Sequence, residues 1–187
     1  MSVSTRDALL KSAEIQLRSK GYAAFSYADL SEEIGIRKAS IHHHFPTKEN
    51  LGVALITQYI DLFTEKLQAI DAAQTDPLER LREFSGLFLA SANDRLLPLC
   101  GALAAEMAAL PASLQELGRR LIVTQLSWME KNLILAAQLS GKTPAKSAKD
   151  CALMLLSALE GASFIDWALG LSSDPLAAFH HILNTLT

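Results

Sequence analysis

The segment FSYADLSEEIGIRKASIHHHFPTKENL, residues 25–51, decides the fold. Its pattern predicts a short helix over 27–34, which Gly35 ends as a C-terminal cap, and a second helix over 38–44, which Pro46 breaks. Only a few residues separate the two helices. Two short helices joined by a tight turn that contains Gly form a helix-turn-helix, so the sequence predicts this motif near the N-terminus.

The side chains of this segment divide into an inward and an outward set. Four apolar residues are spaced to hold the two helices together: Ile34, Ile36, Ile41 and Phe45. Polar and basic residues are left facing outward: Arg37, Lys38, Ser40, His42 and His43. In a helix-turn-helix the second helix enters the major groove of DNA, where such side chains donate to phosphates and to purine acceptors.

Helical periodicity and capping residues continue on both sides of the motif. One helix is expected before it, over 5–20, and a long helix begins after Thr47. Five more helices are predicted further along the chain: 77–93, 99–110, 112–139, 145–169, and a last one from Asp174-Pro175 to the C-terminus. The predicted fold is all-α, with nine helices in two domains, a three-helix head over 1–50 and a six-helix body over 51–187.

The composition supports a helical protein and excludes several other classes. The 187 residues include 33 Leu and 28 Ala but only 3 Val, whereas a β-rich domain needs β-branched and aromatic residues. The high apolar fraction excludes disorder, and two lone cysteines exclude a disulfide scaffold. No charge-free stretch exceeds 13 residues, and the N-terminus has no apolar segment. The sequence therefore predicts neither a membrane span nor a secretory signal. It predicts a cytoplasmic location.

The net charge of −3 for the whole chain argues against a nucleic-acid partner, but the charge differs between regions. Residues 1–50 carry a net charge of +1 and three of the five histidines, whereas residues 51–187 carry −4. A nucleic-acid partner is therefore admissible for the head alone.

Residues 35–51, GIRKASIHHHFPTKENL, resemble the DNA-binding signature of the TetR/AcrR family of transcriptional regulators. The resemblance covers about 5–56, because Gly21-Tyr22, Gly35, Phe45, Lys48 and Leu51 all fall in step with that signature. It implies nine helices, with an N-terminal DNA-binding domain and a C-terminal domain for ligand binding and dimerisation.

The resemblance also implies roles for individual residues in DNA binding. Ser26 and Tyr27 at the start of the first motif helix, and Lys48 after the motif, resemble phosphate contacts. The recognition helix supplies the remaining expected DNA contacts: Arg37, Lys38, Ala39, Ser40, His42, His43 and His44. His42 departs from the family pattern, in which Tyr is common, so the contact there is expected to be polar.

The sequence also contains candidates for a metal site and for a reactive thiol. His42, His43 and His44 are consecutive and point in different directions on a helix, whereas helical metal ligands stand three or four residues apart, so no metal site is predicted. Cys100 could sense oxidants or electrophiles, but a reactive thiol needs exposure and nearby positive charge. Its apolar neighbours favour a buried hydrophobe.

The resemblance places a ligand cavity among the helices of the body. Such sites are mostly apolar, with a few convergent polar groups. The candidate ligand-binding residues are Phe63, Phe84, Phe88, Cys100, Leu103, Glu106, Met107, Trp128, Met129 and Phe164. Among them Glu106 stands alone in an apolar run, so its carboxylate must be paired, exposed or turned toward a ligand.

Small and apolar residues on the last two helices suit an interface between two copies of the chain. The candidate dimerisation residues are Ala158, Gly161, Ala162, Ile165, Phe179, Ile182 and Leu183. Packing within one chain is the alternative explanation for the same pattern.

These observations together predict a homodimeric, ligand-responsive transcriptional regulator. It is expected to be a repressor that binds a palindromic operator in double-stranded DNA and is released by a small-molecule effector. No enzyme motif, cofactor or membrane partner is predicted. The alternatives are a regulator that senses thiol-reactive compounds through Cys100, and a helical adaptor that has lost DNA binding.

Overall fold

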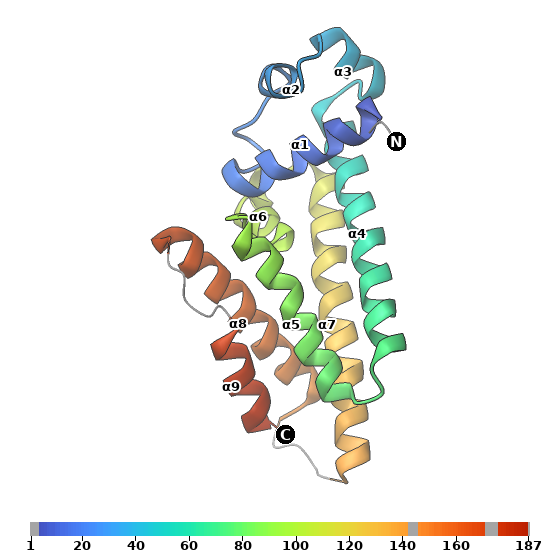
Figure 1. The fold of residues 1–187 in the computed structure, drawn as a ribbon, viewed down its shortest axis with the longest axis vertical. Helices are drawn as coiled ribbons and strands as arrows, with labels where there is room; N and C mark the ends of the chain where they lie inside the picture. The colour runs from blue at the N-terminus through green and yellow to red at the C-terminus, as the bar shows by residue number, and fades with distance from the viewer. Residues whose placement is uncertain (1–3, 142–145, 171–175, 187) are drawn as a thin grey trace. The chain divides into compact units, whose positions relative to one another are not determined.

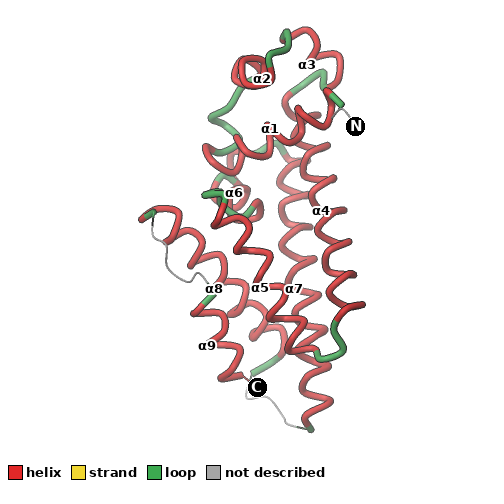
Figure 2. The backbone as a smooth tube through the Cα atoms, in the orientation of Figure 1, coloured by secondary structure: helices red, strands yellow, loops and turns green. Residues whose placement is uncertain are grey.

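A computed structural model describes residues 4–141, 146–170 and 176–186 of the chain. The described residues form nine α-helices and one short 3₁₀-helix, with no strand among them (Figures 1 and 2). The elements are α1 Thr5–Lys20, α2 Tyr27–Ile34, α3 Lys38–His44, α4 Lys48–Ala73, α5 Pro77–Asn93, α6 Leu99–Ala105, η1 Met107–Ala109, α7 Ala112–Ser140, α8 Ala148–Leu169 and α9 Ala177–Leu186. The predicted all-α fold is confirmed.

Most helices begin where a side chain can accept the first free backbone N–H groups. The hydroxyl of Ser4 accepts from Asp7 N–H at the start of α1, and the carboxylate of Asp76 accepts from Leu78 N–H at the start of α5. Pro77 then occupies the first turn of α5, where its missing N–H costs nothing. These caps are local in sequence, which explains why the predicted starts of α1 and α5 agree with the structure.

Two predicted helices differ from the observed ones. The helix expected over 99–110 ends at Ala105 and is followed by η1, and Leu110, which precedes Pro111, has an extended backbone. The helix expected from residue 145 begins at Ala148, where the Ser147 hydroxyl caps it. The predicted start of the last helix at Asp174-Pro175 lies outside the described residues.

The contacts between residues divide the chain into two compact units. Unit 1 comprises residues 1–61 and 99–120, and unit 2 comprises residues 62–98 and 121–187. Helix α6 and the beginning of α7 thus pack with the head, and α1 contacts both α2 and α6. The functional boundary predicted at residue 50 stays a prediction, since contact alone does not assign function to either part.

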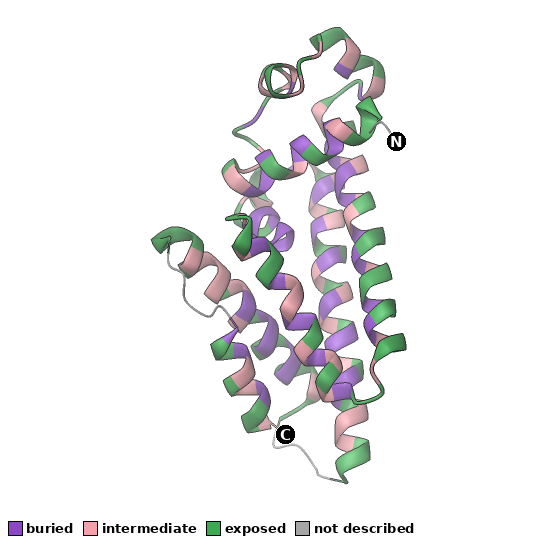
Figure 3. Ribbon diagram, viewed as in Figure 1, coloured by how far each residue is buried: buried purple, intermediate pink, exposed green. Residues whose placement is uncertain are grey.

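Each unit has its own apolar core (Figure 3). Side chains from α1, α2, α3, α4, α6 and α7 are fully buried in unit 1: Leu9, Leu17, Leu30, Ile41, Leu51, Ile56, Leu103 and Leu114. In unit 2, α8 and α9 pack together and α5 packs against α8. The largest fully buried side chains of unit 2 are Phe84, Phe179 and Leu81.

The C-terminal end of α5 contains the only non-glycine residue with positive φ in the described chain. Arg95 has a φ of 54°, and the hydrogen bonds Arg95 N–H to Ala92 O and Leu96 N–H to Ser91 O surround it. This left-handed conformation at a helix end usually falls to Gly, because a Cβ makes it costly.

We therefore expect Arg95→Gly to stabilise the protein by about 0.5–1 kcal/mol, the relief of left-handed strain less the backbone entropy of Gly. Urea unfolding followed by circular dichroism would measure the shift in midpoint. Arg95→Ala is the matched control, since it removes the same side chain and keeps the strain. Equal midpoints for the Gly and Ala variants would contradict the explanation.

Candidate nucleic-acid interface

The turn between α2 and α3 is held by hydrogen bonds from both sides. Gly35 adopts a left-handed conformation with φ 74°, and its N–H donates to Ser31 O at 3.0 Å. Ile36 N–H donates to the same carbonyl, and the Ser31 hydroxyl donates back to Ile36 O. A Cβ on Gly35 would meet nothing within 4 Å, so Gly is needed here for its backbone conformation rather than for space.

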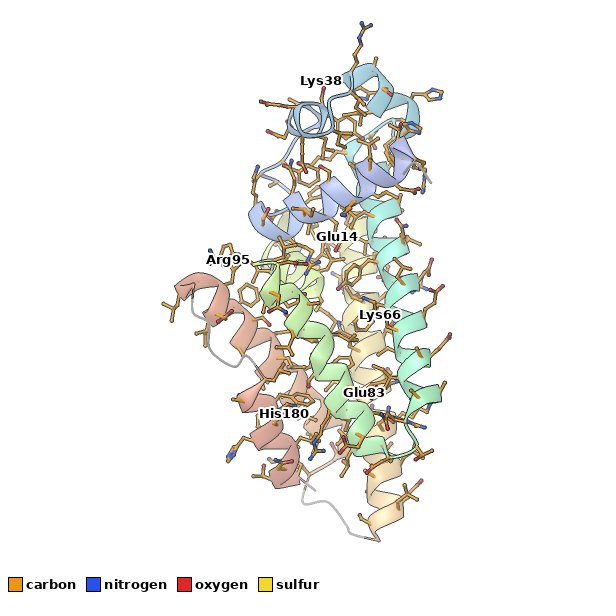
Figure 4. All side chains as sticks on the ribbon, viewed as in Figure 1. Glu14, Lys38, Lys66, Glu83, Arg95 and His180 are labelled. Atoms are coloured by element: carbon orange, nitrogen blue, oxygen red, sulfur yellow. The ribbon has the colours of Figure 1, made fainter. Side chains whose placement is uncertain are left out.

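Helix α3 presents the predicted outward face. Arg37, which caps it, and Lys38, Ala39, His42 and His43 are exposed, while Ser40 and His44 are half-buried. Ile41 and Phe45 are buried beneath them. Lys38 extends away from the other helices of its unit, as Figure 4 shows.

One ring nitrogen of His42 has a partner within the chain. Its Nδ1 lies 3.1 Å from Pro46 O, and a carbonyl only accepts, so this contact is a hydrogen bond when Nδ1 carries the hydrogen. The neutral ring then offers Nε2 as an acceptor. Because His42 also packs edge-on against the Tyr27 ring at 4.9 Å, its orientation is fixed by two elements.

Tyr27, expected to bind phosphate, is already engaged within the protein. Its hydroxyl donates to Phe45 O at 2.8 Å, and burial raises its pKa to about 12, so it stays protonated. A phenol has one hydrogen to donate, and a phosphate oxygen needs a donor. In this structure Tyr27 ties α2 to the end of α3, and its role as a phosphate contact stays a prediction.

Ser26 is likewise occupied as the cap of α2. Its hydroxyl accepts from Ala28 N–H and Asp29 N–H and donates to the Asp29 carboxylate at 2.7 Å. Asp29 also accepts from Ser26 N–H, and these hydrogen bonds lower the pKa of Asp29. The reciprocal pair is a capping box, so the Ser26 hydroxyl has no second hydrogen for a phosphate.

Lys48 was also expected to bind phosphate, and the structure turns it inward. Its ammonium donates to Tyr22 O and Phe25 O, and it lies 4.5 Å and 4.3 Å from the centres of the Tyr22 and Phe25 rings. Burial lowers the pKa of Lys48, and the nearby carboxylates of Glu106 and Asp29 oppose that shift. The role in the structure is to hold the connection between α1 and α2.

One basic residue near α3 is not among the DNA contacts predicted from the sequence. Arg6, on the first turn of α1, is exposed, and its guanidinium carbon lies 5.6 Å from the ring of Phe45 at the end of α3. The sequence shows a basic residue at the start of the first helix, but only the fold brings this residue beside helix α3.

The sequence is similar to known bacterial transcriptional regulators. The family model described as "Bacterial regulatory proteins, tetR family" matches residues 9–55. The transcriptional regulator AcuR of Cereibacter sphaeroides is 30% identical over 184 residues, which cover 91% of this chain and 80% of AcuR.

The chain belongs to the TetR family of transcriptional regulators. A TetR transcriptional regulator from Legionella pneumophila has the same fold, with a TM-score of 0.89 and 28% identity over 100% of both chains. The transcriptional repressor KstR2 of Mycolicibacterium smegmatis is 37% identical over 89 residues, which cover 47% of this chain. The match spans 42% of KstR2, less than half of that relative's length.

The residues expected to bind a ligand in this TetR-family chain fall into both units. Cys100, Leu103, Glu106 and Met107 belong to unit 1, and the other six belong to unit 2. In unit 2 the ring of Phe84 lies 6.1 Å from Phe63, 5.8 Å from Phe88 and 5.5 Å from Trp128, on which it stacks. Met129 is fully buried and Phe164 is half-buried.

Within unit 1 the expected ligand residues have other surroundings. The Glu106 carboxylate accepts from Ala23 N–H at 2.9 Å, so it has a partner within the chain, and its role as a ligand group stays a prediction. A Cβ built on Gly118 would lie 3.3 Å from Met107 Cε, while Leu103 and Cys100 are buried. Because only 5% of Cys100 is exposed, its surroundings do not favour reaction with an oxidant or electrophile.

The expected dimer residues divide between surface and core. On α8, Gly161 and Ile165 are exposed and Ala158 and Ala162 are half-buried, whereas on α9 Phe179 and Leu183 are fully buried within the chain. The prediction was therefore wrong for Phe179 and Leu183, because the apolar side of α9 packs against its own unit. Ile182 is half-buried. By length and composition alone α8 could cross a membrane, a test that the core helix of a soluble protein also passes.

The inward position of Lys48 gives a prediction about DNA binding. We expect Lys48→Ala to weaken DNA binding while leaving the salt dependence unchanged, because no phosphate contact is removed. Lys38→Ala is the control with an exposed charge; it should flatten the slope of log K against log salt by about 0.9 for each head, or about 1.8 for a dimer. Fluorescence anisotropy at several salt concentrations measures both. A flatter slope for Lys48→Ala would restore its role as a phosphate contact.

Proposed function

We propose that the chain is a transcriptional repressor that binds a palindromic operator in double-stranded DNA as a homodimer and leaves it when a small molecule binds. One observation carries DNA binding: residues 34–48 contain no Asp or Glu, and the exposed part of this run includes Arg37, Lys38, His42 and His43. This run thus contributes no carboxylate that would repel phosphates. It sits on a helix whose orientation is fixed by the Gly35 turn and by Tyr27. A cytoplasmic location follows from this function.

The modest charge of the head favours binding by two copies. A single head has a net charge of +1, and phosphate neutralisation provides most of the nonspecific affinity for DNA. Two recognition helices spaced by one turn of the duplex double both the charge and the base contacts. Repression is supported by the similarity to KstR2, which is itself a transcriptional repressor.

Helix α8 carries the apolar face that supports dimerisation. Large side chains along it are exposed: Leu153, Met154, Ile165, Trp167 and Leu169. In Figure 3 the C-terminal part of α8 is coloured as exposed or intermediate. Gly161 and Ala162 lie between them and permit close approach of a second helix. An exposed apolar surface of this kind marks a protein–protein contact.

The aromatic cluster of Phe63, Phe84, Phe88 and Trp128 supports an apolar effector with a hydrogen-bond acceptor. The Nε1–H group of Trp128 is buried and has no acceptor among the described residues. A buried donor without a partner costs about 1–3 kcal/mol, so an acceptor on a bound molecule would be favoured there. This effector would have to prefer the form that does not fit the operator.

Selection of bound fragments from a random DNA pool tests DNA binding directly. The wild-type chain is expected to enrich a palindromic motif whose half-sites are one helical turn apart. The folded double variant Arg37→Ala, Lys38→Ala is the control and should enrich none. Recovery of no palindrome by the wild-type chain at moderate salt would contradict the proposed function.

Dimerisation through α8 is tested by Ile165→Glu, which places a charge on a side chain that is 58% exposed. We expect this variant to shift from dimer to monomer in sedimentation and to lose most operator affinity. Val123→Glu on α7 is the matched control, since Val123 is also 58% exposed. If both variants stay dimeric, the interface does not include this part of α8.

A further inference from the structure

The segment 21–25, which joins α1 to α2, is held from two sides within unit 1. Lys48, at the start of α4, donates to Tyr22 O and Phe25 O. Glu106, directly after α6, accepts from Ala23 N–H, 83 residues away in sequence. The ammonium and the carboxylate therefore bind the C=O and the N–H of the same Tyr22–Ala23 peptide group, and the ammonium also binds the carbonyl of Phe25.

The position of Glu106 is itself fixed. Its carbonyl accepts from Ala109 N–H at 2.8 Å and from Leu110 N–H at 3.2 Å, so its backbone anchors η1. Its side chain makes a charge-assisted hydrogen bond, which is about twice as strong as a neutral one. The carboxylate is thus a defined anchor point for the segment and not a freely moving surface group.

Gly21 shows how closely Glu106 approaches the segment. A Cβ built on Gly21 would overlap the Glu106 carboxylate, and the φ of Gly21 is 93°. Gly is favoured here by its backbone conformation, and a Cβ would in addition displace the end of the Glu106 side chain.

The segment leads directly into the helix-turn-helix. Helix α2 begins at Tyr27, and the Tyr27 hydroxyl binds Phe45 O at the end of α3. A shift of segment 21–25 would therefore move α2 and α3 together. Hydrogen bonds to base edges fail once donor and acceptor separate by several tenths of an ångström beyond about 3.2 Å, so a small shift is enough to lose contacts.

We propose that Glu106 is a positioning residue for DNA binding, which holds segment 21–25 and thereby sets the place of the recognition helix α3. This proposal rests on the proposed function, because the position of α3 matters only for a chain that binds DNA. It assigns Glu106 a task within unit 1 that does not require contact with DNA or with an effector.

The two variants Glu106→Ala and Glu106→Gln separate position from charge. Both remove one negative charge, which by electrostatics alone would strengthen DNA binding. Only Gln retains a carbonyl oxygen that can accept from Ala23 N–H. We expect Glu106→Ala to bind the selected operator about 10-fold more weakly, a loss of about 1.4 kcal/mol, while Glu106→Gln stays within about 2-fold of wild type.

Fluorescence anisotropy on the operator, with circular dichroism to confirm folding, measures this difference. The salt dependence should be the same for all three proteins, because no phosphate contact changes. Equal or tighter binding by Glu106→Ala would overturn the proposal.

Hydrogen exchange of the free protein provides a readout that does not need DNA. The Ala23 amide should exchange faster in Glu106→Ala than in Glu106→Gln or wild type, because its acceptor is lost. A wild-type chain that selects no DNA would refute the proposed function and the positioning role, yet slow exchange at Ala23 would still reveal the contact. If the wild-type chain binds DNA but the Ala23 amide exchanges at the same rate in Glu106→Ala, the contact is refuted and so is the positioning role, while the proposed function stands.

The double variant Gly21→Ala, Glu106→Ala tests the contact from the opposite side. Gly21→Ala alone is expected to lower the unfolding midpoint through backbone strain and collision with the carboxylate. In the Glu106→Ala background only the strain remains, so the further drop should be smaller. Additive effects would show that the methyl group added at position 21 does not meet the Glu106 carboxylate, which would overturn the placement of that carboxylate on which the proposal rests.

Discussion

The arrangement of the head depends on the ammonium of Lys48. This charge is half-buried, and such a group is stable only if its hydrogen bonds are replaced. Two backbone carbonyls and the faces of two aromatic rings provide that replacement, all from the short connection between α1 and α2. Because the Lys48 side chain comes from the first residue of α4, it fixes the entry of α2 to the beginning of the long helix.

The helix-turn-helix is held by hydrogen bonds that use up many of its polar atoms. Ser26 and Asp29 cap α2, Ser31 closes the turn, and Tyr27 binds the end of α3. Each of these side chains has a limited number of hydrogens and lone pairs. Structural use therefore leaves the exposed residues of α3 and the exposed Arg6 as the groups available to DNA.

Residue type and spacing predicted helix α3 correctly, whereas the roles of the residues around it in DNA binding stay predictions. A Lys, Ser or Tyr beside such a helix can donate to a phosphate or to a carbonyl of its own chain, and the sequence pattern is the same in both cases. The same ambiguity applied to Phe179 and Leu183, whose apolar character suits a dimer surface or a core equally well. Burial decides between these choices, and burial depends on what packs above each helix.

The sequence by itself determined the helices, because their caps and turns involve residues only two to five positions apart. Ser4 and Asp7, Ser26 and Asp29, and Asp76 and Leu78 are such pairs, and Gly35 ends α2 through the carbonyl of Ser31. Only the tertiary structure decided which way Lys48 and Glu106 point. Their partners lie 23 to 83 residues away, and no local periodicity encodes a contact over that distance.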